Sequence, residues 1–105
     1  MGEISETLTI SQTSGGLVVS GEIDSSTADM LAGFLIPAPG DSGEFEVDMA
    51  EVAFIDSSGL RVLIQAHQQA EQSQRSLVII NPSPIVSRLF GVSGLNELFN
   101  ITNRG

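Results

Sequence analysis

Two short segments near the start of the chain alternate apolar and polar residues, as half-buried β-strands do. Leu8 and Ile10 alternate with polar neighbours, and a Ser-Gly-Gly turn at residues 14–16 separates them from the apolar run at residues 17–19, which Gly21 follows. Two such strands joined by a glycine-containing turn are typical of a β-hairpin. The pattern therefore predicts an antiparallel pair of strands at the beginning of the fold.

A helical pattern follows the hairpin. The spacing i, i+3, i+4 and i+7 of apolar residues predicts an amphipathic helix starting near Ser26, with Ala28, Leu31, Ala32 and Leu35 on its buried face. Ser26 and Asp29 occupy the positions of a capping box. Proline has no amide hydrogen and clashes with the preceding turn, so we expect the Pro-Ala-Pro-Gly segment at residues 37–40 to end this helix.

The middle of the chain combines a strand pattern with a longer helix. Residues 45–49 alternate apolar and acidic positions, and an apolar run at residues 52–55 leads into Asp-Ser-Ser-Gly at residues 56–59. A helix is predicted from there, with glutamines on its polar positions and a buried stripe made of Leu60, Leu63, Ile64, His67 and Ala70.

The last third predicts a strand at residues 76–80 and a helix that begins at Pro82 or Pro84. That helix runs through about Phe90 and is closed by Gly91 or Gly94. A final short helix is expected at residues 95–99.

A chain of 105 residues has room for one compact domain, so we expect residues 1–105 to form a single domain. The order of the elements predicts an α/β fold with a mixed sheet of four to five strands and about four helices packed on it. The opening pair is antiparallel, and the later strands, joined by right-handed helical crossovers, are parallel.

Charge is distributed unevenly along the chain, which carries a net charge of −9. Residues 1–50 hold nine acidic residues and no Lys or Arg, whereas residues 51–105 hold four acidic residues against Arg61, Arg75, Arg88 and Arg104. Nucleic acids and anionic membranes require clustered cations, so we expect neither as a direct partner. The acidic half favours a basic protein partner, or serves solubility alone.

Several other functions are disfavoured by residues that the sequence lacks. It has no cysteine and a single histidine, which argues against disulfides, thiolate catalysis and transition-metal sites, and we expect no cofactor. The first residues have neither a basic start nor an apolar run, and no stretch approaches 18 apolar residues, so we expect a cytoplasmic protein.

The segment Asp56-Ser57-Ser58-Gly59 places two hydroxyls where a strand passes into a helix. Unpaired amides and the helix macrodipole favour negative charge at that point, so a phosphorylated serine would be tolerated there. The alternative interpretation is that the two serines simply cap the helix.

An enzyme with a Ser-His-Asp triad is a further interpretation, but geometry argues against it. His67 lies ten residues beyond Ser57 on the same predicted helix, about 15 Å along its axis at 1.5 Å per residue. No hydrogen bond can join them within one chain, so we expect no catalytic residue.

Three segments, in the right order, resemble the STAS family, the domain shared by sulfate transporters and anti-sigma factor antagonists. They are FIDSSGLRVL at residues 54–63, SGEID at residues 20–24 followed by Thr27, and Arg88-Leu89-Phe90 with Gly94-Leu95 and Leu98-Phe99. The resemblance implies a STAS fold over the whole chain.

The resemblance also implies an anti-sigma factor antagonist. In such proteins the first serine after the motif aspartate, here Ser57 with Ser58 as second choice, is phosphorylated by an anti-sigma factor that is an ATP-using serine kinase. The unphosphorylated form binds this partner and frees a sigma factor, which regulates transcription indirectly, and a phosphoserine phosphatase resets the switch. We expect a monomer or weak dimer whose partner-binding residues are Asp24, Thr27, Asp56, Ser57, Ser58, Gly59 and Arg61.

Asp24 would lie beside Ser57 at the same end of the sheet, either for partner contact or simply to cap a helix. The family also contains interaction subunits that do not switch, in stress-sensing and lipid-transport complexes. Such a lipid-transport subunit would look more natural without a phosphorylatable serine after Asp56, and this chain has two.

Overall fold

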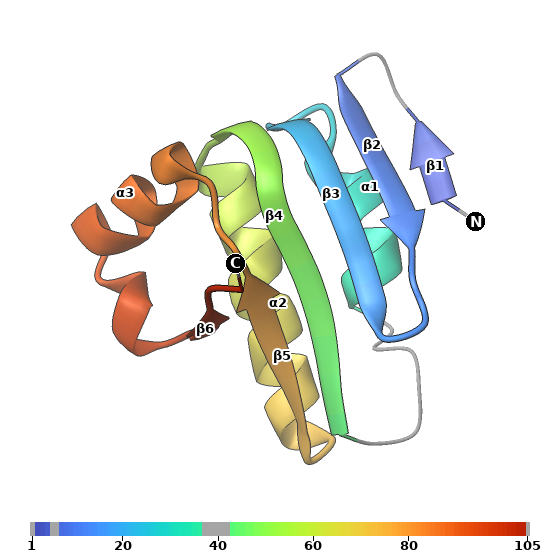
Figure 1. The fold of residues 1–105 in the computed structure, drawn as a ribbon, viewed down its shortest axis with the longest axis vertical. Coiled ribbons are helices and arrows are strands. Elements are labelled where there is room, and N and C mark those ends of the chain that lie inside the picture. The colour runs from blue at the N-terminus through green and yellow to red at the C-terminus, as the bar shows by residue number, and fades with distance from the viewer. Residues whose placement is uncertain (1, 5–6, 37–42, 105) are drawn as a thin grey trace.

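The computed structural model describes residues 2–4, 7–36 and 43–104. Within these residues, six strands form one mixed sheet whose order follows the chain (Figure 1). The strands are β1 (Gly2–Ile4), β2 (Leu8–Gln12), β3 (Gly16–Ile23), β4 (Gly43–Ile55), β5 (Arg75–Ile80) and β6 (Asn100–Thr102). The helices are α1 (Ala28–Leu35), α2 (Ser57–Gln72), α3 (Pro84–Val92) and the single 3₁₀ turn η1 (Leu95–Glu97).

The predicted fold class is confirmed. β2 and β3 form the antiparallel hairpin, and β3, β4, β5 and β6 are parallel neighbours joined by helical segments. The two edge strands, β1 and β6, were not predicted. Each has only three residues, too few for apolar and polar positions to alternate visibly.

The alternating stretch and the apolar run of the middle region form one strand, β4. Val18 pairs with Asp48 but Ser20 pairs with Glu51, so β4 gains one residue over β3, and it gains another before Phe54. The Asp48 carboxylate accepts a hydrogen bond from the Ala50 amide (3.0 Å) at the first irregularity. These bulges break the period of two, which makes one strand look like two segments in the sequence.

Gly21, part of the SGEID segment, sits where two backbones approach closely. Its φ is +109°, and a Cβ there would lie 2.0 Å from the carbonyl oxygen of Thr7. The same oxygen accepts a hydrogen bond from the amide of Glu22 (2.7 Å). Only glycine fits this position without moving the backbone.

The capping box predicted at Ser26 and Asp29 is wrong. α1 begins at Ala28, and its N-cap residue, Thr27, makes no capping hydrogen bond with its side chain. Ser26 instead donates its hydroxyl to Asp24 (2.7 Å), because the preceding residues form a tight loop of their own. The predicted stop at residues 37–40 lies outside the described residues.

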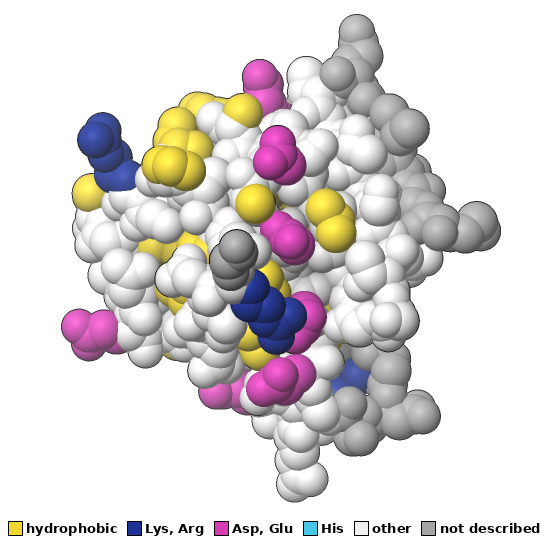
Figure 2. Space-filling view, in the orientation of Figure 1, with side chains coloured by type: hydrophobic (Ala, Val, Ile, Leu, Met, Phe, Trp, Pro, Cys, Tyr) yellow, Lys and Arg dark blue, Asp and Glu magenta, His cyan; other side chains and the backbone are white. Residues whose placement is uncertain are grey.

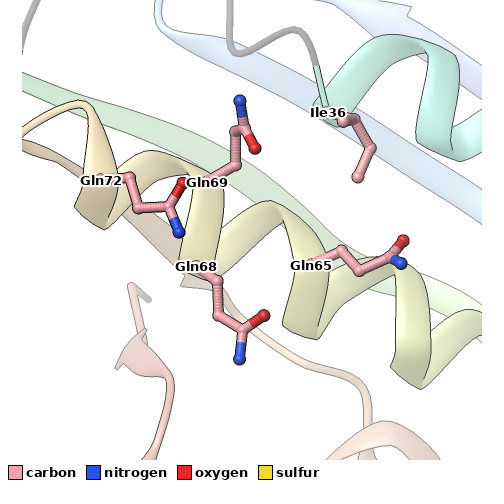
Figure 3. Close-up of a pocket in the computed structure, with 5 residues that line it drawn as sticks. All are labelled: Ile36, Gln65, Gln68, Gln69 and Gln72. Atoms are coloured by element: carbon pink, nitrogen blue, oxygen red, sulfur yellow. The ribbon is translucent and has the colours of Figure 1, made fainter.

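The helix over residues 57–72 largely agrees with its predicted pattern. Leu60, Leu63, His67 and Ala70 are buried, whereas Ile64 is half-buried. The glutamines of the polar face line a hollow of about 300 Å³ across from Ile36, the residue that follows α1 (Figure 3): Gln65, Gln68, Gln69 and Gln72.

The C-terminal layer differs in detail from the prediction. α3 does begin at Pro84, but Gly91 lies inside the helix, and Gly94 is the residue that turns the chain with a φ of +72°. The predicted helix at residues 95–99 is reduced to the single turn of η1. Phe90 and Phe99 pack against each other in the common core (ring centroids 5.1 Å apart).

The two faces of the sheet differ. α1 and α2 lie behind it in Figure 1 and α3 lies to one side, while no helix of the described chain crosses the front. Acidic side chains gather on this open face with one cationic side chain among them (Figure 2). Arg104 forms an ion pair with Glu46 of β4 (2.6 Å). No described helix is both long and apolar enough to cross a bilayer.

Candidate functional site

The predicted site residues lie at the carboxyl ends of β3 and β4. These strands are parallel neighbours, with Ile23 paired to Ile55, so the chain leaves both at the same level. The amide of Asp56 donates a hydrogen bond to the carbonyl oxygen of Ile23 (3.1 Å). Segments 24–27 and 56–61 therefore emerge side by side, and we call this region the switch edge.

Asp56 caps helix α2. Its backbone is extended (φ −117°, ψ −169°), and its Oδ1 accepts hydrogen bonds from the amides of Ser58 (2.8 Å) and Gly59 (3.3 Å). The interpretation in which Ser57 and Ser58 cap the helix is thus wrong. Aspartate is as good a cap as serine, and its position one residue earlier leaves both hydroxyls free of that role.

The two serine hydroxyls lie within the first turn of α2. Ser57 is exposed and Ser58 is half-buried, and within the described chain neither hydroxyl has a hydrogen-bond partner. Ser57 is therefore the more accessible of the two to an enzyme that must reach the hydroxyl oxygen.

Asp24 organises the loop that faces this turn. One of its carboxylate oxygens accepts hydrogen bonds from the amide (2.9 Å) and the hydroxyl (2.7 Å) of Ser26, and a longer one from the Thr27 hydroxyl (3.3 Å). The side-chain hydrogen bond from Ser26, above all, lowers the pKa of Asp24 from its ordinary value. Asp24 is therefore a fixed negative charge at the switch edge.

Two of the predicted partner-binding residues are buried. Thr27 is only 3% exposed; its hydroxyl donates to the carbonyl of Glu22 (2.9 Å) and accepts from the amide of Asp24 (2.9 Å). Gly59 is buried too, and a Cβ there would lie 2.6 Å from Ile23 and 2.7 Å from Ile55. These two residues hold the edge in shape from beneath.

Arg61 supplies a positive charge beside this acidic edge. It is exposed on α2, four residues after Ser57, which places the two side chains on one face of the helix. It forms no ion pair with any residue of the described chain.

Other candidate chemistry lies away from the edge. His67 is 3% exposed, contacts the Phe99 ring edge-on (ring centroids 5.8 Å apart) and points Nε2 at Glu71 (3.5 Å), so it is a core residue of the helix.

Sequence reasoning missed the role of Ser26, which holds Asp24 through two hydrogen bonds. The Asp-x-Ser spacing of an Asx turn was the available signal. Among the described residues, no group of three His, Asp or Glu side chains could hold a metal ion.

The fold and the switch edge define a class of protein: a small α/β domain that presents a serine at the start of a helix. Comparison with known proteins agrees with this class. The family model described as "Mlab, STAS domain" matches residues 6–101, and the chain therefore belongs to the STAS domain family.

Its relatives include anti-sigma factor antagonists. The anti-sigma-B factor antagonist of Listeria monocytogenes is 34% identical over 88 residues, which cover 83% of this chain and 77% of the relative. The anti-sigma-B factor antagonist of Bacillus subtilis is 29% identical over 84 residues, 80% of this chain and 77% of the relative.

A solved structure supports the fold. An anti-sigma factor antagonist (STAS) domain protein from Planctomyces limnophilus superimposes with a TM-score of 0.72 over 93% of this chain and 91% of its own. The sequence identity is 12%, so this likeness concerns the fold alone.

Proposed function

We propose that this protein is an anti-sigma factor antagonist that is switched by phosphorylation of Ser57. Its partner is an anti-sigma factor of the serine-kinase type, bound at the switch edge while Ser57 is unmodified. One observation carries the proposal: Asp56 takes over the capping of α2, which leaves the exposed Ser57 hydroxyl without a partner in the described chain.

The charge around Ser57 explains why a phosphate would weaken binding. The Ser58 and Gly59 amides already bind Asp56, so they are not free to neutralise a phosphate. The new group adds about 1.5 to 2 negative charges next to Asp56 and near the fixed charge of Asp24. In a desolvated contact this repulsion opposes binding, and each 1.4 kcal/mol lost lowers affinity tenfold, at about 25 °C.

The contact surface consists of the exposed and half-buried residues of the switch edge. Asp24, Asp56, Ser57, Ser58 and Arg61 present carboxylates, hydroxyls and one cation to the partner. The buried Thr27 and Gly59 act indirectly, by fixing the two segments that carry them.

The rest of the cycle follows from this assignment. Release of the partner returns the anti-sigma factor to its sigma factor, so the protein regulates transcription indirectly. A phosphoserine phosphatase restores the binding form. We place the protein in the cytoplasm as a monomer or weak dimer.

Phosphorylation is the direct test. The purified anti-sigma kinase from the same organism and ATP are expected to add one phosphate, mapped by mass spectrometry to Ser57. Ser57→Ala should abolish the modification, and the matched control Ser58→Ala should retain it. Modification of Ser58 in the Ser57→Ala variant would contradict the assignment of the site.

Binding tests the switch itself. Ser57→Asp should lose affinity for the same kinase in calorimetry by at least tenfold, because it places a charge where the phosphate would be. Affinity equal to that of the unmodified protein would overturn the switch.

A non-switching interaction subunit is the second candidate. The observation that favours it is the description of the matching family model, which names Mlab beside STAS. Native co-purification distinguishes the candidates: subunits of a lipid-transport or stress-sensing complex would support the second, and an anti-sigma kinase the first.

A further inference from the structure

A shallow apolar groove of about 250 Å³ lies between the end of β4 and the outer side of α3. Phe54 and Ile55 form its β4 side. The α3 side follows the spacing i, i+3, i+4 and i+7 along one face of the helix: Ile85, Arg88, Leu89 and Val92. We call this surface the α3 groove.

The lining of the α3 groove is unusually exposed for such apolar side chains. Phe54 is 42% exposed, Ile85 44% and Val92 80%. α3 is anchored to the core by other residues, Val86 and Phe90, both fully buried. Hydrophobic side chains gather over α3 and the end of β4 in Figure 2. The outer stripe is therefore not needed to hold α3 in place, and a contiguous apolar patch of this kind indicates an interaction surface.

The α3 groove adjoins the switch edge along the chain. Phe54 and Ile55 directly precede the capping residue Asp56 and the exposed Ser57. A partner that covers Ser57 thus meets apolar surface within a few residues along β4. Apolar contacts surrounded by polar ones are the usual composition of a protein interface.

Charge at the groove indicates what the occupant carries. Arg88 is exposed in the middle of the apolar stripe and forms no ion pair with a residue of the described chain. In a protein with a net charge of −9, a free cation set among apolar side chains complements a carboxylate.

We propose that the α3 groove is the second part of the docking surface for the anti-sigma factor and receives an apolar ridge of that partner, with a carboxylate facing Arg88. This inference rests on the function proposed above and deepens it. The switch edge carries the phosphate control, and the α3 groove supplies apolar contact area that phosphorylation does not touch.

Variants on the exposed stripe test the proposal by calorimetry against the purified anti-sigma kinase from the same organism. Val92→Glu and Arg88→Glu should each lower its affinity at least tenfold without changing the thermal midpoint, since both side chains are exposed. Leu98→Glu is the matched control, because Leu98 is an exposed apolar residue (39%) outside the groove lining, and its affinity should stay within twofold. Arg88→Ala should also flatten the salt dependence of binding.

Each of the remaining outcomes overturns either the proposed α3 groove or the proposed phosphorylation switch. If Val92→Glu and Arg88→Glu bind like the unmodified protein while Ser57→Asp does not, the α3 groove is overturned and the switch stands. If Ser57→Asp also binds normally, the proposed function itself fails. If Val92→Glu only converts a dimer to a monomer in sedimentation, with the kinase affinity unchanged, the groove holds a second copy of the chain and the inference is wrong. Should Val92→Glu fail to fold, Arg88→Glu decides alone.

Discussion

The amide of Asp56 donates a hydrogen bond to the carbonyl oxygen of Ile23 (3.1 Å), although the two residues are far apart in the sequence. This bond extends the pairing of β3 and β4 one step beyond their last paired residues, Ile23 and Ile55. It brings the Asp24 loop and the start of α2 to one edge. Four substitutions examine how that edge and its support are built.

Removing the cap of α2 should destabilise the protein. Asp56→Ala leaves the amides of Ser58 and Gly59 without their acceptor, at an expected cost of about 0.5–2 kcal/mol in the free energy of unfolding. Asp56→Asn is the control, because asparagine caps as well as aspartate does, and its stability should stay close to that of the original. Urea denaturation measures both, and equal losses in the two variants would mean that the carboxylate charge, not the cap, matters.

Adding one methyl group at Gly59 should destabilise the core beneath Ser57. In Gly59→Ala the new Cβ lies 2.6 Å from Ile23 and 2.7 Å from Ile55, so a buried isoleucine must shift, at about 1–3 kcal/mol. Gly33→Ala is the matched control within α1, where nothing lies within 4 Å of the new Cβ, and should stabilise by up to about 1 kcal/mol. A Gly59→Ala variant as stable as the original in thermal unfolding would contradict this packing.

Ser83 ties α3 to the sheet. Its buried hydroxyl donates to the carbonyl oxygen of Val52 (2.6 Å), so Ser83→Ala leaves that buried oxygen unpaired, at an expected cost of about 1–3 kcal/mol. The hydroxyl of Ser87 makes only an exposed contact to Pro82 (3.4 Å), and Ser87→Ala should change stability by less than about 0.5 kcal/mol. Chemical denaturation that ranks the two variants equally would rule out this tether.

The pH response of the edge depends on Asp24. Because its pKa in the folded protein is below the ordinary value of 3.8, its contribution to stability is present above that value and is lost as the pH falls through the lowered pKa. Ser26→Ala removes the main cause and should raise the Asp24 midpoint in a carboxyl NMR titration. Ser25→Ala should leave it unchanged, because that exposed side chain donates no hydrogen bond to Asp24. A midpoint that does not move in Ser26→Ala would exclude this hydrogen bond as the cause.

The sequence patterns predicted the parts of the fold in which burial repeats with a fixed period. Leu31 and Leu35 mark one helix face, and Val47 and Met49 mark one strand face, because burial on a regular element selects every apolar position in turn. The place of Ser57 at the start of α2 followed from the same pattern.

Most of the details that the patterns missed depend on single hydrogen bonds between a side chain and the backbone. Nothing in the local sequence decides whether Asp56 or a serine accepts the first amides of α2, because all three are good caps. The burial of Thr27 depends on its bond to the Glu22 carbonyl, which exists only once the loop has closed. β6 is a strand because β5 offers a free edge beside it, and not because of its own three residues.

The order of the strands has a consequence for assembly. Each strand lies beside its predecessor in the chain, so no strand must be inserted between two that have already paired. The sheet can grow outward by adding one strand at a time to its edges. Each new pairing then requires the closure of only one loop or helical connection between consecutive strands. Tags or partner domains joined to either end would meet the three-residue strands β1 and β6, each of which is separated from the β3–β4 seam by one strand. The chain is thus arranged to accept fusions without disturbing its central seam.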